Sequence, residues 1–269
     1  MSNANNKIII GMSGGVDSSM SALLLKKSGW NPIGISLKFS IWNNECNNEC
    51  NNETNSAKQN KSNFEYAEKV CKAINIPHYV VDVSQEFQKQ VIKYFVSELK
   101  KNRTPNPCVI CNRYLKFKQL FTIAHNYNAK HISTGHYAKI KKNKQTNQYE
   151  LHKHKDRKKD QSYFLSFLPK KWLKNIIFPL EKYTKPEIFD LAKKQGFTYF
   201  LEKKESQDFC FAAKKNFNAF KEFLLNKKPG LIKDVTGNKL GTHYCIFIQL
   251  DKEKEYICQE DLILLLILI

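Results

Sequence analysis

The sequence is poor in acidic residues. Its 269 residues include 25 Asp and Glu against 44 Lys and Arg, which gives a formal net charge of +19. Such an excess of positive charge favours a polyanionic partner and rapid electrostatic steering toward it. A membrane surface is the rival polyanion, but the chain has no evident cationic amphipathic helix. The composition therefore favours a polyanion other than a lipid surface.

Long hydrophobic runs are also missing. The first residues, MSNANNKIIIG, contain no hydrophobic signal region, and the apolar run 262–269 is far too short to span about 30 Å of hydrocarbon. The eight cysteines lack the regular spacing of a disulfide scaffold. We therefore expect a cytoplasmic location, no membrane partner, and thiols that are reduced and reactive.

Two familiar phosphate-binding motifs are absent. A Walker A loop needs Lys-Ser/Thr after its second glycine, and a dinucleotide fold needs GxGxxG. Residues 8–19 read IIIGMSGGVDSS instead: a β-branched strand, a glycine turn, and a helix that opens at Asp17. Loop amides and a helix N-terminus attract phosphate, and glycines let the anion approach the backbone. The stretch predicts a phosphate site.

Strand and helix patterns alternate along the next part of the chain. Such alternation predicts an α/β fold with a doubly wound parallel sheet, whose loops after the strands share one edge with the phosphate site. Gly135 stands at the end of such a strand, where a nucleotide would approach the backbone, and Cys71 falls on an apolar helix face as a core residue. The expected strands are 32–37, 78–83 and 131–134, and the expected helices are 63–75, 85–100, 112–124 and 185–195, the last with Thr184 as its cap.

Residues 103–112, RTPNPCVICN, bring two cysteines to a helix start. Two prolines disfavour helix through Pro107, so a rigid loop delivers Cys108 and Cys111. A thiol at a helix N-terminus is expected to have a lowered pKa. A zinc half-site is the alternative, although no second half-site is evident. Cys46 and Cys50 are interpreted as incidental loop residues.

Residues 139–159 are strongly basic, with His, Arg and Tyr among the lysines and a hairpin expected around 148–154. A charge run is normally a solvated face, but this mixture suits phosphate contacts and base stacking. Farther on, ESQDFCF places Cys210 between two aromatic residues, which by itself indicates a buried cysteine.

Taken together, GMSGGVDSS, RTPNPCVICN, TGHYAKI, KDQSYFL and ESQDFCF resemble the motifs of the tRNA-specific 2-thiouridylase (MnmA/TrmU) family, in family order, over about residues 7–243. The resemblance implies a Rossmann-like PP-loop ATP pyrophosphatase fold of the adenine nucleotide alpha-hydrolase type. It also implies ATP, with Mg²⁺, and tRNA as a partner. ATP would adenylate the wobble uridine of tRNA, and a persulfide sulfur would then replace the activated oxygen. A cysteine desulfurase or sulfur-relay protein would supply that sulfur.

The resemblance also assigns site residues. Cys210 would carry the persulfide and Cys111 would attack it, releasing sulfide or ending in a Cys111–Cys210 disulfide. No protein metal ligand is assigned. The matching ATP-binding positions are Gly11, Met12, Ser13, Gly14, Gly15, Val16, Asp17, Ser18, Leu37 and Gly135; Asn106, Pro107 and Cys108 match the segment that touches the target base, and His136, Lys159, Asp160 and Gln161 match tRNA contacts.

The sequence departs from the family at two places. Some members carry Asp where this chain has Cys108, so Cys108, Cys111 and Cys210 could instead hold an iron–sulfur cluster. The other departure follows Gly241-Thr242-His243, where the family reads close to YTIGQRKG and continues into a β-barrel. A one-base shift of plausible codons for residues 247–256 restores that motif.

The expected organisation follows from these departures. We expect a PP-loop catalytic domain over 1–204, a truncated central domain over 205–246, an out-of-frame tail over 247–269, and no C-terminal β-barrel. Two alternatives to a tRNA 2-thiouridylase stay open. One is an inactive tRNA-binding remnant, and the other is a different PP-loop tRNA-modifying enzyme, such as a tRNA-lysidine or 4-thiouridine synthase.

Overall fold

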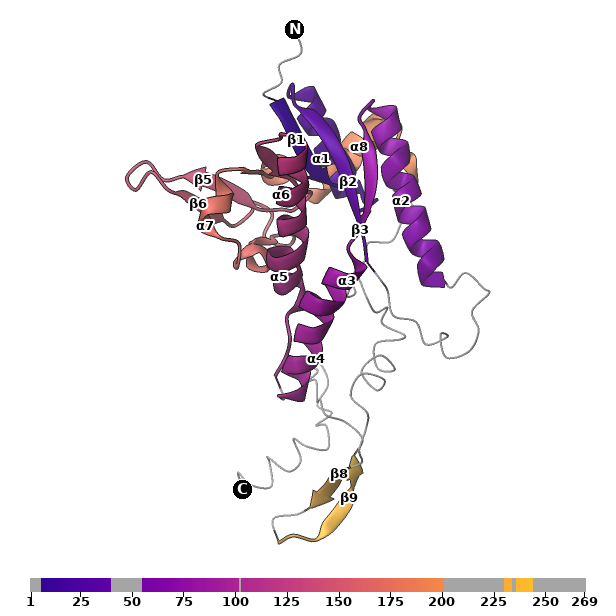
Figure 1. The fold of residues 1–269 in the computed structure, drawn as a ribbon, viewed down its shortest axis with the longest axis vertical. Coiled ribbons are helices and arrows are strands. Elements are labelled where there is room, and N and C mark those ends of the chain that lie inside the picture. The colour runs from indigo at the N-terminus through magenta and orange to yellow at the C-terminus, as the bar shows by residue number, and fades with distance from the viewer. Residues whose placement is uncertain (1–5, 40–54, 102, 201–229, 234–235, 244–269) are drawn as a thin grey trace.

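The chain builds a parallel sheet with helices on both faces (Figure 1). A computed structural model describes residues 6–39, 55–101, 103–200, 230–233 and 236–243. The sheet has the strand order β3-β2-β1-β4-β7, and all its neighbouring strands are parallel. Its strands are β1 (Lys7–Gly11), β2 (Asn31–Lys38), β3 (His78–Asp82), β4 (His131–Ser133) and β7 (Ile176–Ile177).

The path of the chain through this sheet creates a switch point. From β1 the chain moves outward through β2 to β3, and it then returns to the other side of β1 with β4. In open parallel sheets, ligands bind beyond the carboxyl ends of the strands at such a reversal. The end of β1 lies at this point, which confirms the predicted α/β doubly wound fold.

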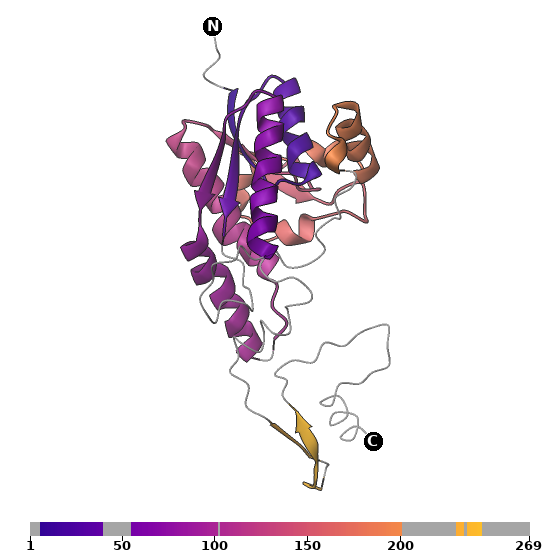
Figure 2. The ribbon, with the colours of Figure 1, turned by 90° about the vertical axis from the view of Figure 1, so that its right-hand side faces the viewer.

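The side chains of the apolar strand β1 point alternately to the two faces of the sheet, and helices bury them on both faces. Ile8 and Ile10 face α1 (Val16–Lys27) and α2 (Asn55–Ala73), where Cys71 is fully buried as predicted. Ile9 points to the opposite face, against α6 (Phe117–Asn126). Figure 2 shows the two layers of helices on either side of the strands. The central strand, and with it the loop that follows, is thereby fixed from both sides.

Two segmented helices lie between β3 and β4, and Figure 1 shows the first extending beyond the carboxyl edge of the sheet. The sequence predicts continuous helices over 85–100 and 112–124, whereas each contains a π-helical turn. The second also begins earlier, at Pro107. The segments are α3 (Ser84–Phe87), η2 (Gln88–Ile92), α4 (Lys93–Lys100), α5 (Pro107–Cys111), η3 (Asn112–Lys116) and α6.

The remaining described elements lie outside the five-stranded sheet. The expected hairpin is formed by β5 (Lys139–Lys142) and β6 (Tyr149–His152). Thr184 is the N-cap residue of α8 as predicted, and the Glu187 carboxylate completes a capping box by accepting hydrogen bonds from the Thr184 amide and hydroxyl. The other elements are η4 (Ser162–Leu165), α7 (Lys170–Leu173), η5 (Pro179–Lys182), α8 (Lys185–Lys194), η6 (Thr198–Phe200) and an antiparallel pair, β8 (Gly230–Lys233) and β9 (Lys239–His243).

Several predictions fall outside the described residues. These are the roles of Cys46, Cys50 and Cys210, the junction at 204–205, most of the expected central domain and the tail 247–269. In the described part of the chain, no helix is both long and apolar enough to cross a membrane.

Candidate nucleotide and sulfur-transfer site

The glycine loop after β1 has the geometry of an anion cradle. Gly14 adopts a left-handed backbone with φ of 72°, and a Cβ there would lie 2.0 Å from the Asn63 carbonyl oxygen of α2. Only glycine fits this position without strain. Gly15 then forms the N-cap of α1, so the first-turn amides of a twelve-residue helix point into the loop. These amides and the helix dipole favour a phosphate group.

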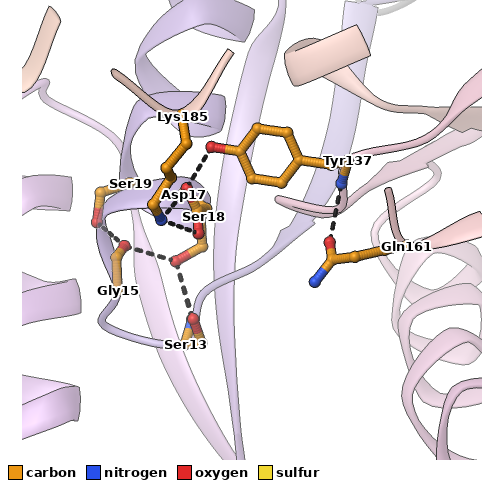
Figure 3. Close-up of polar contacts among 8 residues, drawn as sticks. All are labelled: Ser13, Gly15, Asp17, Ser18, Ser19, Tyr137, Gln161 and Lys185. Carbon is orange, nitrogen blue, oxygen red and sulfur yellow. Dashed lines mark hydrogen bonds and ion pairs between the residues drawn. The ribbon is translucent and has the colours of Figure 1, made fainter. Parts of the chain in front are cut away.

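Serine side chains hold this loop in shape (Figure 3). The Ser18 hydroxyl accepts a hydrogen bond from the Ser13 amide at 3.2 Å and donates to the Gly15 carbonyl at 3.1 Å. Ser19 donates to the same carbonyl at 2.9 Å. The Met12 and Val16 side chains are buried in the core, so only their backbone can face a ligand. The loop therefore offers amides in a fixed arrangement.

Asp17 is the acidic group of the loop, and two partners hold it. The Lys185 ammonium lies 2.8 and 2.7 Å from its two carboxylate oxygens, and the Tyr137 hydroxyl donates to Oδ1 at 2.7 Å. Tyr137 is held in turn, because its amide donates to Gln161 Oε1 at 2.9 Å (Figure 3). The Tyr137 carbonyl also accepts from the Gln161 amide at 2.9 Å. The Asp17 carboxylate thereby joins the start of α1 to the loop after β4 and to α8.

Tyr137 and Lys185 are site residues that the sequence reasoning missed. Tyr137 was within reach, since it is the last residue of the TGHY stretch that follows β4. Lys185 carries a weaker signal: it is the first residue of α8, where a positive charge opposes the helix dipole and needs another reason to be there. Its burial beside Asp17 supplies that reason.

The expected ATP-binding positions come from three neighbouring strands. Gly11 ends β1, Leu37 lies near the end of β2, and Gly135 follows β4. Gly135 packs against the first turn of α1, where a Cβ would lie 2.6 Å from the Ser18 nitrogen. Its lack of a side chain therefore serves the fit of strand to helix, a different reason from the nucleotide approach expected from the sequence.

The proline-rich segment presents its thiols on the first turn of a helix. The Asn106 side chain caps α5 by accepting from the Val109 amide at 3.3 Å, and Pro107 occupies the first helical position. The predicted lowering of the thiol pKa is wrong for Cys108. Burial raises the pKa of the Cys108 thiol, and the opposing charge of Lys116 does not offset it.

Cys111 is more deeply enclosed than its proposed role suggests. It is 3% exposed and packs in an apolar cluster with residues of the neighbouring segmented helix, among them Phe87 and Phe95. Cys108 on the same turn is partly exposed. Cys210 lies outside the described residues, so no distance joins it to either thiol. As the helix stands, Cys108 is the accessible thiol of the pair.

Among the expected tRNA contacts, the Asp160 and Gln161 side chains have internal partners. The Asp160 carboxylate accepts from the His154 amide at 2.8 Å and from the Ser162 hydroxyl at 2.8 Å. Burial alone would raise the pKa of Asp160, but these hydrogen bonds outweigh it and the pKa is lowered. Gln161 holds Tyr137, as described above. The Asp160 and Gln161 side chains thus hold the loop after Lys159 in shape.

His136 follows Gly135 and lies between the site and the core. Its Nδ1 is 2.7 Å from the Thr134 hydroxyl, and its ring stands near Phe117 and Phe178. Burial, with a smaller contribution from the charge of Lys116, lowers the pKa of His136 to about 3. The imidazole is therefore neutral at physiological pH and offers hydrogen bonds rather than charge.

Metal ligands are sparse in the part of the chain that the structure describes, where no three His, Cys, Asp or Glu side chains gather into a group. A magnesium ion carried by nucleotide phosphates needs few protein ligands. The carboxylate oxygens of Asp17 are ligands of the kind that Mg²⁺ takes. Hydrogen bonds from Lys185 and Tyr137 fix the position of both oxygens. The iron–sulfur alternative includes Cys210, which lies beyond the described residues.

Two curated relatives are similar to this chain over most of its length. A protein from Caldanaerobacter subterraneus subsp. tengcongensis, named tRNA-specific 2-thiouridylase MnmA 1, is 42% identical over 241 residues, covering 89% of this chain and 65% of its own length. A Limosilactobacillus reuteri protein, named tRNA-specific 2-thiouridylase MnmA, is 38% identical over 244 residues, covering 90% and 61%. This chain thus spans about two thirds or less of the length of these curated relatives.

A solved structure of a predicted tRNA methyltransferase subunit from Methanocaldococcus jannaschii aligns with 20% identity and a TM-score of 0.40, over 70% of this chain and 74% of its own. The match to a family model covers more of this chain than that structural alignment does. The family model described as the tRNA methyl transferase HUP domain matches residues 6–214. Most of the chain, including the glycine loop and the cysteine helix, lies within that range. The chain therefore belongs to the tRNA methyl transferase HUP domain family.

Proposed function

We propose that the chain is a tRNA-uridine 2-sulfurtransferase, which adenylates the wobble uridine of tRNA with ATP and then replaces the activated oxygen with sulfur. The glycine cradle beside Gly135, at the switch point of the sheet, is the observation that carries the proposal. The relatives named tRNA-specific 2-thiouridylases, which resemble this chain over about nine tenths of its length, support the choice of acceptor.

The first half-reaction needs a better leaving group than a carbonyl oxygen. The uridine O2 attacks the α-phosphorus of ATP, an O–P bond forms, and pyrophosphate leaves. The loop amides and the N-terminus of α1 would bind the departing phosphates, and Lys185 and Tyr137 would hold the Asp17 carboxylate beside them. Mg²⁺ bound with ATP would offset the phosphate charge, and Asp17 is the carboxylate of the loop suited to hold it.

The second half-reaction transfers sulfur. A desulfurase or relay protein would load Cys210 as a persulfide, and Cys111 would attack its inner sulfur, forming the Cys111–Cys210 disulfide and releasing sulfide. Sulfide adds at C2 of the adenylated uridine, and AMP departs with the former carbonyl oxygen. A dithiol reductant then reopens the disulfide. Because Cys111 is buried in the apolar cluster, this step requires the Cys111 thiol to become exposed.

The test is nucleoside mass spectrometry of tRNA incubated with the full chain, ATP, Mg²⁺, a persulfide donor and a reductant. The proposal expects 2-thiouridine, formed only when ATP is present. Cys210→Ser should abolish 2-thiouridine but leave ATP–pyrophosphate exchange largely intact, whereas Asp17→Ala should impair exchange first. A chain that binds tRNA but leaves it unmodified would be a tRNA-binding remnant instead.

A further inference from the structure

An aromatic hollow lies next to the cysteine helix and belongs to none of the residues assigned so far except Asn106. It has a volume of about 100 Å³, and its walls include Tyr94, Ile110, Tyr163 and Phe167. Tyr163 is 65% exposed and Phe167 is 56% exposed, the highest values among the large apolar side chains that the structure describes as exposed. Rings left this open, in pairs at one hollow, indicate a binding surface rather than core.

The two rings are held in place rather than carried on a free loop. The Asn112 side chain donates to the Phe164 carbonyl at 3.0 Å, and Arg113 donates to the Phe167 carbonyl at 2.7 Å. The Tyr163 ring also meets the Phe164 ring edge to face at 5.6 Å. The segment bearing both rings is thereby tied to the helix that carries the cysteines. A ligand would find the rings already positioned, at little entropic cost.

The surroundings of the hollow match a nucleic acid. Arg113 places a guanidinium beside Phe167, the chain as a whole carries a net charge of +19, and the rings offer flat apolar faces. Unpaired bases stack on exposed aromatic rings while cationic side chains neutralise the backbone, which makes this combination typical of single-stranded RNA recognition. The positive charge would also attract an acidic protein, but the two exposed rings favour a partner whose bases can stack on them.

We infer that the aromatic hollow binds an unpaired base of the tRNA anticodon loop by stacking on Tyr163 and Phe167, next to the uridine that is modified. The inference rests on the proposed function and on the family resemblance, which implies that Asn106, Pro107 and Cys108 touch that uridine. Asn106 borders the hollow, and its amide donates to the Tyr94 hydroxyl at 3.4 Å, so the two subsites share a wall. A nucleotide next to the modified uridine would therefore be the one that contacts the two rings.

The test uses a 17-nucleotide anticodon stem-loop RNA with an unmodified wobble uridine and 2-aminopurine at each flanking position in turn. Affinity is measured by anisotropy with the full chain, and stacking by quenching of 2-aminopurine. Loss of one stacked base should weaken binding roughly 5- to 150-fold, so Tyr163→Ala and Phe167→Ala should show this loss and no quenching. Tyr163→Phe keeps the ring and should bind within about twofold of wild type.

Tyr79→Ala is the matched control, because Tyr79 is 46% exposed on β3 and does not border the hollow. Affinity and quenching that survive in Tyr163→Ala and Phe167→Ala as in the control would overturn the inference. So would a lowered melting temperature with unchanged RNA affinity, since the rings would then be covered by another segment of the chain. Absence of any stem-loop binding by wild type would overturn it as well.

The same reagents separate this inference from the proposed function. RNA that stacks and binds as expected but never acquires 2-thiouridine contradicts the proposed sulfur transfer alone. Formation of 2-thiouridine by wild type, with affinity unchanged in both alanine variants, contradicts the stacking site alone.

Discussion

The Lys185 ammonium and the Asp17 carboxylate form a two-point ion pair, with Nζ 2.8 and 2.7 Å from the two oxygens. The Lys185 side chain is only 10% exposed and that of Asp17 is 32% exposed. Their separation of 168 residues means that the pair joins α8 to the glycine loop across the whole domain. A pair so enclosed is screened far less than a surface ion pair.

The ion pair predicts strong coupling in a double-mutant cycle. Asp17→Asn leaves the Lys185 ammonium buried without its counter-charge, and this should cost about 1–3 kcal/mol of unfolding free energy. Lys185→Met should restore part of that loss in the double variant, giving a coupling of about 0.5–3 kcal/mol in urea unfolding. The exposed Lys38–Asp82 pair is the control, and its coupling should not exceed about 1 kcal/mol. Additive losses at Asp17 and Lys185 would contradict the prediction.

Gly135 and Gly15 should respond differently to alanine. At Gly135 the new Cβ would lie 2.6 Å from the Ser18 nitrogen and 2.7 Å from the Asp17 carbonyl carbon, and backbone cannot move aside cheaply. We expect a loss of about 1–3 kcal/mol in urea unfolding. At Gly15 the nearest atom is the Ser13 hydroxyl oxygen at 3.5 Å, so stability should stay within about 1 kcal/mol.

ATP binding gives the complementary result for these two variants. If phosphate approaches the Gly15 backbone, Gly15→Ala should lose ATP affinity in calorimetry while it keeps its stability. Equal stability losses in both variants, or unchanged ATP affinity in Gly15→Ala, would contradict this account of the loop.

Cys108 should alkylate slowly at neutral pH. Because burial raises the pKa of its thiol, its thiolate fraction at pH 7 is smaller than that of a free cysteine. Peptide-mapped iodoacetamide labelling should show a rate at Cys108 below that of a cysteine peptide at pH 7, increasing as the pH rises through 9. Lys116→Met removes the charge that opposes this shift and should slow labelling further. A Cys108 rate above that of the free peptide at pH 7 would contradict the prediction.

His136 should make folding stability depend on pH below neutrality. Its pKa is about 3 in the folded chain and near 6.5 when unfolded, so between these values the unfolded state binds the extra proton. Stability from this group is therefore complete above about pH 6.5 and falls as the pH decreases toward 3, by at most about 1.4 kcal/mol per pH unit. Urea unfolding at pH 7 and 5 should give a larger difference for wild type than for His136→Gln. Equal differences would contradict the shift.

The sequence alone determined the local parts of this protein. Residues 8–19 specify strand, loop and helix through β-branched residues, paired glycines and a serine-rich first turn. Thr184 and Glu187 specify the start of α8 in the same local way. These patterns work because a cap or a tight turn depends on residues within a few positions of one another. The alternation of such units also sufficed to predict a doubly wound parallel sheet.

Tertiary structure alone decided which side chains meet. Asp17 finds Tyr137 and Lys185 at sequence separations of 120 and 168, and no local pattern links them. Packing against Phe87 and Phe95 buries Cys111, and burial likewise reverses the pKa shift that a helix N-terminus predicts for Cys108. Desolvation depends on every element that covers a group, so it cannot be read from the residues beside it. The sequence could place the phosphate loop, but only the fold shows what holds its carboxylate.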